Sequence, residues 1–274
     1  MNCAVPPGFG VRCSFDRVNV AMHRLLVSKE TLRSSTAALP SAASRHLKVL
    51  RPRPGEPIEL FDGCGSTRVY TYSADGLTAA GEIVTAPSPS TRLTLFACVT
   101  KGSRWDWTIE KAVELGVGRI VPVLSERCIV RLSAAERAPK AERWRRIAED
   151  AARQSDAVWL PEILPAVDFD EALDLAKTCR RMFAGALMTP PPPPLLTAVE
   201  AADGEGDWGL FVGPEGDFTP DELEALLKIA TPVSFGPTIL RAETAAIFGL
   251  SVLAARNYLR SRDYRLENYG KLKS

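Results

Sequence analysis

The sequence has few of the residues that build common metal sites and nucleophile sites. Its 274 residues include two histidines, His23 and His46, so a catalytic triad with a histidine base is not indicated. The six cysteines are scattered without a C-x-x-C pair, which argues against zinc and redox motifs. Unpaired cysteines of this kind favour reduced thiols and a cytoplasmic location. We therefore expect no metal.

Long apolar runs and nucleotide motifs are missing too. No stretch approaches the roughly 18 apolar residues that a membrane helix needs, so we expect no membrane partner. There is no Walker A sequence, which leaves nucleotide hydrolysis without support. Gly204 to Gly209 matches G-x-G-x-x-G, but it precedes an apolar run and carries two acids where a pyrophosphate would lie. We reject it as a dinucleotide site.

The net charge of +1 hides an uneven distribution. Residues 162–235 contain fourteen acidic and four basic residues, so the remainder of the chain is strongly basic. Residues 24–53 alone hold seven lysines and arginines and one acid, Glu30. A localised basic segment on a nearly neutral protein indicates a polyanion contact. The alternative is a basic face that only contacts solvent.

The sequence pattern divides the chain into two expected domains. Residues 1–21 are expected to be an extension, either disordered or upstream of a mis-assigned start at Met22. Residues 22–87 form a small β-rich module, with a strand over Arg68–Tyr72, a hairpin at Asp75-Gly76, a returning strand over Leu77–Val84 and a short basic helix over Arg45–Arg51. Pro87–Ser90 is a linker, residues 91–262 form a second domain, and residues 263–274 are a tail.

The second domain alternates strands and helices, which is typical of the α/β class with a parallel sheet and helices on both faces. Five strands are predicted: Leu93–Val99, Ile120–Leu124, Met182–Leu187, Leu210–Val212 and Val233–Phe235. Helices are predicted over Trp105–Leu115, Glu136–Gln154, Phe169–Thr178, Glu222–Ile229 and Ile239–Leu259. The prolines of 190–194 predict a loop.

Two Gly-Pro turns, Gly213-Pro214 and Gly236-Pro237, each follow a short predicted strand. Between them, Thr219-Pro220-Asp221-Glu222 has the pattern of a capped helix start. Ligands of open α/β sheets bind at the carboxyl ends of the strands, so the paired turns predict a binding cleft. Each turn alone is equally consistent with an ordinary strand-to-helix connection.

Two other loops leave alternatives open. Lys101-Gly102-Ser103-Arg104 is consistent with a phosphate contact at a helix start or with a plain helix-start loop. Arg127 and Arg131 admit the same two interpretations. Trp105 and Trp107 are expected to be packing residues rather than base-stacking platforms.

An ordered set of motifs resembles the bacterial small-subunit rRNA uridine-N3 methyltransferases, the RsmE family of the SPOUT superfamily. The resemblance covers residues 22–259. It rests on the segments His46–Arg51, Gly55-Glu56, Asp62-Gly63, Lys101, Glu110–Val117, Ser125–Cys128, Ala151–Ser155, Gly213–Gly216 and Ile239–Ala245.

The resemblance implies a PUA-like RNA-binding β-barrel, then a SPOUT domain with a deep trefoil knot and a homodimer formed through the knotted region. It implies S-adenosyl-L-methionine as methyl donor and 16S (small-subunit) ribosomal RNA as the partner, with N3 of a uridine as the acceptor. The implied cofactor-binding residues are Ala184, Gly185, Val212, Gly213, Pro214, Glu215, Gly216, Phe235, Gly236, Ile239, Leu240, Thr244 and Ala245.

Loss of the N3 proton spreads negative charge onto O2 and O4 of the uracil, and a guanidinium fork suits such a planar anion. We therefore assign Arg241 as the catalytic cation. Glu215 or Glu243 is expected to accept the proton, with helix capping as the alternative for Glu243. RNA contacts are expected from Arg24, Arg45, His46, Lys48, Arg51, Lys101 and Arg127, with Arg143, Arg145 and Arg146 as additions.

The chain departs from the family pattern at Thr238 and at Asp156-Ala157, where the family commonly has arginine and Gly-Arg. Two alternatives therefore remain at the level of sequence. One is an RNA-binding or ribosome-assembly protein that has kept the fold without catalysis. The other is a SPOUT methyltransferase for another RNA position.

Overall fold

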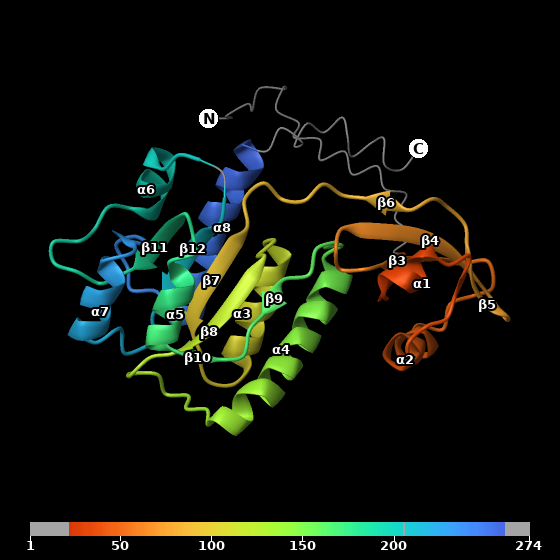
Figure 1. Ribbon diagram of the computed structural model, residues 1–274, viewed down its shortest axis with the longest axis horizontal. Helices are drawn as coiled ribbons and strands as arrows, with labels where there is room; N and C mark the ends of the chain where they lie inside the picture. The colour runs from red at the N-terminus through yellow and green to blue at the C-terminus, as the bar shows by residue number, and fades with distance from the viewer. Residues whose placement is uncertain (1–21, 205, 261–274) are drawn as a thin grey trace, which may run out of the picture.

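The computed structural model describes residues 22–204 and 206–260, which form two sheets with helices around them (Figure 1). The expected extension 1–21 and tail 263–274 lie outside the described residues. Within the described part, the helices are all too short or too polar to cross a membrane.

The first sheet uses residues that precede the expected linker. Its order is β1 (His23–Leu26), β3 (Pro57–Phe61), β4 (Ser66–Ser73), β5 (Gly76–Ala79), β2 (Thr36–Ala37), and β6 (Val84–Thr85) pairs with β4. β1 runs parallel to β3, and the other pairs are antiparallel. Leu25, Ile58, Leu60 and Tyr70 fill the core beneath α1 (Lys29–Arg33) and α2 (Ser41–Leu50). The predicted strand, hairpin and basic helix are therefore confirmed.

Two features of this part differ from expectation. A closed barrel is not found among the described residues, because β1 and β2 stand at opposite ends of the sheet. With two residues each, β2 and β6 offer too few backbone groups to close a ring. The returning strand predicted over Leu77–Val84 is divided into β5 and β6, with Gly81 in the break.

The second sheet is entirely parallel. Its order is β10 (Val167–Asp168), β8 (Arg119–Leu124), β7 (Leu93–Cys98), β12 (Trp208–Val212), β11 (Arg181–Gly185), β13 (Thr231–Val233), and β9 (Glu162–Ile163) pairs with β8. Each of the five predicted strands has a parallel counterpart, but the last, predicted over Val233–Phe235, runs over Thr231–Val233, so Ser234 and Phe235 lie in the loop after it. β9 and β10 were not predicted, because two-residue strands carry no periodic signal.

Helices cover both faces of this sheet, as predicted (Figure 1). Leu95 and other odd-numbered residues of β7 face the core formed with α3 (Ser103–Glu114), α4 (Ala134–Gln154) and α8 (Ala242–Arg260). Phe96 of β7 faces the opposite core, with α5 (Phe169–Ala176) and α7 (Pro220–Leu227). The short helix α6 (Leu195–Ala201), directly after the proline loop, was not predicted.

The predicted helix start at Thr219 is confirmed in detail. Thr219 Oγ1 accepts from the backbone N–H of Glu222 at 3.2 Å, and Glu222 Oε2 accepts from the backbone N–H of Thr219 at 3.0 Å. This reciprocal box satisfies two of the N–H groups left free at the start of α7. It therefore fixes where the loop after β12 ends.

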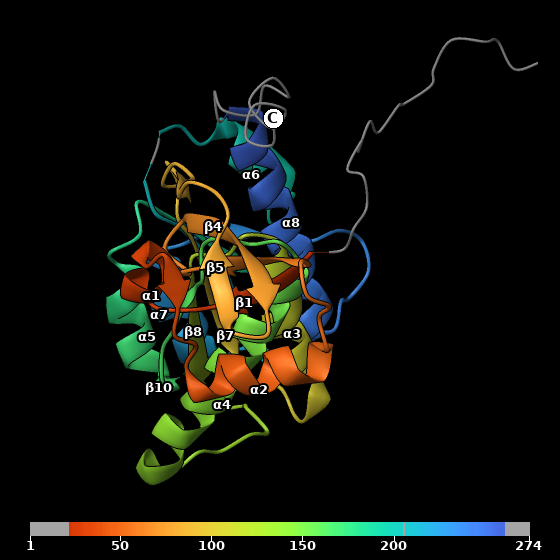
Figure 2. The same ribbon diagram turned by 90° about the vertical axis from the view of Figure 1, so that its right-hand side faces the viewer.

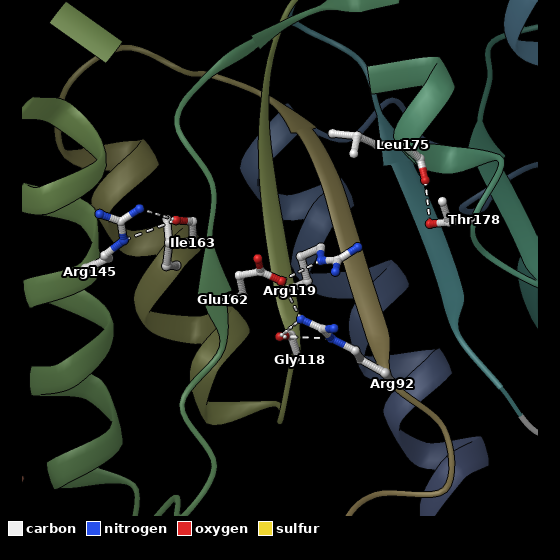
Figure 3. A network of polar contacts seen from close by, with 8 residues as sticks. All are labelled: Arg92, Gly118, Arg119, Arg145, Glu162, Ile163, Leu175 and Thr178. Atoms are coloured by element: carbon white, nitrogen blue, oxygen red, sulfur yellow. Dashed lines mark hydrogen bonds and ion pairs between the residues drawn. The ribbon is translucent and has the colours of Figure 1, made fainter. Parts of the chain in front are cut away.

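Arginines attach β9 to the amino-terminal edge of the sheet (Figure 3). Glu162 accepts from Arg92 Nη2 and from Arg119 Nε, both at 2.8 Å. Burial alone would raise the pKa of Glu162, but these bonds hold it below its usual value. Arg145 of α4 donates to the carbonyl of Ile163 at 3.0 Å. Arg145 is thereby used in the fold, and its expected contact with RNA stays a prediction.

A narrow seam joins the two parts of the chain. Gly65 N–H donates to the carbonyl of Val158, and Leu160 N–H donates to the carbonyl of Gly63, both at 2.9 Å. Gly65 has a φ of 93°, and a Cβ there would lie 2.3 Å from the ring of Trp159. The seam therefore needs glycine for both its backbone angle and its close approach.

We expect Gly65→Ala to lower the free energy of unfolding by about 2–4 kcal/mol, since it combines a left-handed backbone angle with overpacking. Urea unfolding followed by tryptophan fluorescence measures this change. Gly81→Ala is the matched control: nothing lies within 4 Å of a Cβ at that exposed site, and a change within about 0.5 kcal/mol is expected. Equal losses in both variants would contradict the role of the seam.

Candidate functional site

The loops after β7, β8, β11, β12 and β13 all leave the parallel sheet at one edge. β11 pairs with β12 on one side and with β13 on the other, and Gly185 at its end is opposite Val233. A Cβ on Gly185 would lie 2.3 Å from the ring of Phe235. Glycine therefore lets the loops after β11 and β13 approach each other.

Backbone hydrogen bonds fasten these two loops together. Leu195 N–H donates to the carbonyl of Ser234 at 3.0 Å, and Ser234 N–H donates to the carbonyl of Pro193 at 2.9 Å. The proline loop 190–194 thus borders the predicted cleft. The residues that the resemblance assigned to the cofactor lie on these loops, at the ends of β11 and β12, and at the start of α8. Their role in binding stays a prediction.

Exposure divides that set. Ala184, Val212 and Ala245 are buried, so they would offer backbone groups rather than side chains. Ile239 is 81% exposed, and Leu187, on the neighbouring loop after β11, is 61% exposed. Exposed aliphatic side chains beside glycine-rich backbone form a surface that suits the apolar face of a ligand.

Polar contacts hold the loop after β12 in place. Arg127 Nη1 donates to the carbonyls of Gly216 at 3.1 Å and Phe218 at 3.2 Å. Glu126 N–H donates to Glu222 Oε1 at 2.8 Å. Arg127 is exposed and its guanidinium supports this loop, so its predicted contact with RNA stays a prediction.

Two carboxylates were candidates for accepting a proton, and they have different surroundings. Glu215 is partly exposed and lies 3.4 Å from Arg104 Nη1. Glu243 is 8% exposed and its Oε2 has no hydrogen-bond partner among the described residues. It faces a narrow cavity that Thr100 and Trp105 also line. Arg241, the residue directly before α8, is exposed, and its carbonyl accepts from the backbone N–H of Ala245 at 2.8 Å.

The residues predicted to contact RNA differ in how exposed they are. Arg45, Lys48 and Arg51 are exposed on and just after α2, and Lys101 is exposed on the loop after β7. His46 is half-buried, and burial followed by the positive charge of Arg153 lowers its pKa, so it is expected to be neutral near pH 7. α2 and α4 lie at the same side of the molecule in Figure 2.

Arg24 does not belong to this surface. It is 5% exposed and its guanidinium is engaged by residues of both parts of the chain. Arg143 of α4 pairs with Asp106, with Nη1 at 2.7 Å from Oδ1, while Arg146 is exposed. Sequence shows charge but not burial, which explains why Arg24 was placed with the surface arginines.

Sequence reasoning missed two features near this edge. Arg104 was considered for a phosphate contact, but its role as the partner of Glu215 depends on segments 111 residues apart. Cys98 and Cys128 meet at Ser125, with sulfur-to-oxygen distances of 3.4 and 3.3 Å, and burial raises the pKa of Cys98. Spacing along the chain gave no signal of that cluster. In the described ranges, no group of three His, Cys, Asp or Glu side chains is arranged to hold a metal.

A family model described as an RNA methyltransferase domain matches residues 86–254, which contain the parallel sheet and its glycine loops. Relatives described as ribosomal RNA small subunit methyltransferase E include one from Synechocystis that is 30% identical, with 86% of this chain and 78% of the relative covered. One from Mycobacterium tuberculosis is 30% identical over 75% of this chain and 80% of its own length. The chain belongs to the ribosomal RNA small subunit methyltransferase E family.

Solved structures agree. A Neisseria gonorrhoeae ribosomal RNA small subunit methyltransferase E bound to S-adenosyl methionine has a TM-score of 0.72 and 31% identity, over 86% of this chain and 98% of that one. A Legionella pneumophila protein described as a methyltransferase with bound SAM has the same TM-score, 27% identity and the same coverage. The predicted family and the mixed α/β fold with a parallel sheet are confirmed.

Proposed function

We propose that this protein transfers the methyl group of S-adenosyl-L-methionine to N3 of a uridine in 16S ribosomal RNA. The observation that carries the proposal is the convergence of the glycine loops after β11, β12 and β13 at one sheet edge. A structure with this fold and 31% identity binds S-adenosyl methionine.

The chain's own residues fit that cofactor. Gly185 keeps the edge between the loops free of a side chain, and Gly236 has a φ of 124° with nothing within 4 Å of a Cβ position. Leu187 and Ile239 supply exposed apolar surface for an adenosine face, while backbone N–H and C=O groups at the loops suit its polar atoms. When bound, the cofactor supplies the electrophilic methyl group.

The protein's task is to hold uracil in line and to stabilise the charge that develops on it. Arg241 is the proposed cation for uracil O2 and O4, because it is exposed at this edge and permanently charged. Glu215 is the proposed proton acceptor, since its carboxylate is accessible and Arg104 orients it. The burial of Glu243 makes a supporting role beneath the loop after β7 the better assignment for that residue.

RNA would be held by Arg45, Lys48 and Arg51 around α2, together with Lys101 on the loop after β7. The glycine loops after β11, β12 and β13 are called the donor loops below. We also propose the finer features of the family: an N-terminal lobe of the PUA-like kind over residues 22–87, a domain over residues 91–262, and a trefoil knot in its C-terminal part. Insertion of β12 between β7 and the earlier strand β11 supports the knot. An experimental density map whose traced chain was unthreaded would exclude it.

A homodimer through the C-terminal helices is part of the proposal. Leu196 of α6 and Phe248 of α8 are 56% and 43% exposed and border one apolar groove with Val199 and Val252. Such a patch is typical of a protein interface. Sedimentation equilibrium should give a dimer that Phe248→Glu converts to monomer, and a wild-type monomer at tens of micromolar would exclude this interface.

Arg241→Ala should lower the single-turnover methylation rate by about 10²–10³-fold, or roughly 3–4 kcal/mol, because the enolate-like charge loses its cation. Calorimetry should show cofactor affinity unchanged. Nucleoside mass spectrometry of small subunits from an unmodified strain identifies the methylated atom. Arg181→Ala, which removes an exposed arginine at the opposite sheet edge, is the control. Wild-type rates in both variants would rule out the role of Arg241.

The same assay separates the alternatives. A wild-type protein that binds RNA but neither binds the cofactor nor methylates would be a binding protein that has kept the fold. A methyl group on another nucleoside atom would place it among methyltransferases for other RNA positions. Thr238 and Asp156-Ala157, where the chain departs from the family pattern, are the positions to exchange in that event.

Affinity for rRNA should fall steeply with salt, since phosphate contacts release counterions. Each of Arg45→Ala and Lys48→Ala is expected to reduce the slope of log K against log[salt] by about 1. Fluorescence anisotropy with a labelled rRNA fragment measures the slope. Val49→Ala, which changes an uncharged and 76% exposed residue of the same helix, should leave it intact. A salt-independent affinity would remove this helix from the interface.

A further inference from the structure

Arg24 is a buried arginine placed between the two parts of the chain. It lies on β1, is 5% exposed, and its guanidinium centre is 4.5 Å from the centroid of the Phe61 ring. A charge in such a place is unfavourable unless its donors are satisfied. The partners of this guanidinium therefore indicate why the charge is there.

Those partners come from both sides. Nε donates to Glu59 Oε2 of the neighbouring strand β3 at 2.5 Å. Nη1 donates to the carbonyl of Ala152 in the last turn of α4 at 2.9 Å, and both Nη atoms lie 3.4 Å from the carbonyl of Ala157. Asp156 Oδ1 is 3.8 Å from Nε. One planar group thus joins the first sheet to the end of a helix in the second part.

The end of α4 is a favourable place for this cation. The last carbonyls of a helix have no partner within the helix and carry the negative end of its dipole. Arg24 satisfies one of them, at Ala152, from a different sheet. The seam of Gly63–Gly65 with Val158–Leu160 supplies apolar and backbone contacts beside it, but no charge.

α4 in turn leads to the donor loops. Trp144 of α4 packs edge-on against Trp105 of α3, with 5.7 Å between ring centroids. Arg104, at the start of α3, pairs with Glu215 on the loop after β12. A fixed angle between the first sheet and α4 therefore fixes the distance from α2 to the donor loops.

We infer that Arg24 is a positioning residue for methyl transfer: it holds the N-terminal lobe, and RNA bound to that lobe, in one orientation relative to the donor loops. This inference rests on the proposed function. Loss of Arg24 is expected to lower the methylation rate without weakening the binding of RNA or cofactor. RNA and cofactor are still bound, but the target nucleotide reaches the cofactor in the productive geometry less often.

Arg24→Gln is the test variant, because glutamine keeps hydrogen-bonding groups but cannot span the distance to β3 and α4 at once. Affinities for S-adenosyl-L-methionine and for the rRNA fragment should stay within about twofold of wild type. The single-turnover methylation rate should fall at least tenfold. Amide exchange should accelerate at Gly65 and Leu160, which cross the seam, and not within β12.

A disulfide provides the rescue. Cys64 and Trp159 face each other at an antiparallel bridge of the type without direct hydrogen bonds, flanked by the bonds from Gly65 and Leu160. Such pairs bring side chains close, and Cys64 is exposed and unpaired. In Arg24→Gln combined with Trp159→Cys, mild oxidation by oxidised glutathione joins the two thiols and reduces the glutathione disulfide. Methylation should recover in the oxidised protein and be lost again on reduction.

The outcomes are distinct. If Arg24→Gln methylates at the wild-type rate, or if the oxidised double variant stays slow with its cross-link confirmed by mass spectrometry, the inference is overturned. Arg24→Gln treated with the same oxidant is the control. If Arg24→Gln does not fold by circular dichroism, Arg24→Lys takes its place with the same expected pattern at smaller size. A wild-type protein without methylation activity would refute the proposed function instead.

Discussion

Parallel pairing throughout the second sheet is the constraint on which the rest of the structure depends. Because β7, β8, β11, β12 and β13 all point the same way, the loops that follow them meet at one edge. The helices on both faces make this pairing stable by burying the strands on two sides. Residues more than 100 positions apart, such as Arg104 and Glu215, come into contact for this reason.

Parallel pairing brings these loops to one edge, and polar contacts hold the loops after β8, β11, β12 and β13 in place there. Arg127 holds two carbonyls of the loop after β12, Glu222 closes the start of α7 and accepts from Glu126, and Ser234 is tied to the proline loop. These groups form hydrogen bonds within the protein and hold the loop backbone in place. Backbone atoms held this way are pre-organised, so binding a cofactor orders fewer groups at that moment.

The sequence predicted the second sheet better than the first. Near-continuous apolar strands such as β7 and the capping box at Thr219 are local signals, and both are present as expected. Strands of two residues depend on such distant partners: β9 is held by Arg92, Arg119 and β8, and β10 by its pairing with β8. The basic character of Arg24 was visible, but its burial results from pairing between residues 128 positions apart.

The seam formed by Gly63, Gly65 and residues 157–160 has a consequence for modular exchange between relatives. The first sheet is contiguous in sequence, from β1 to β6, and ends before the predicted linker of residues 87–90. Its docking surface, however, is encoded some seventy residues beyond that linker, at Trp159 and Leu160. A chimera that exchanges only the N-terminal residues would join two surfaces that did not evolve together. The segment to exchange therefore includes residues 157–160 as well as the first sheet.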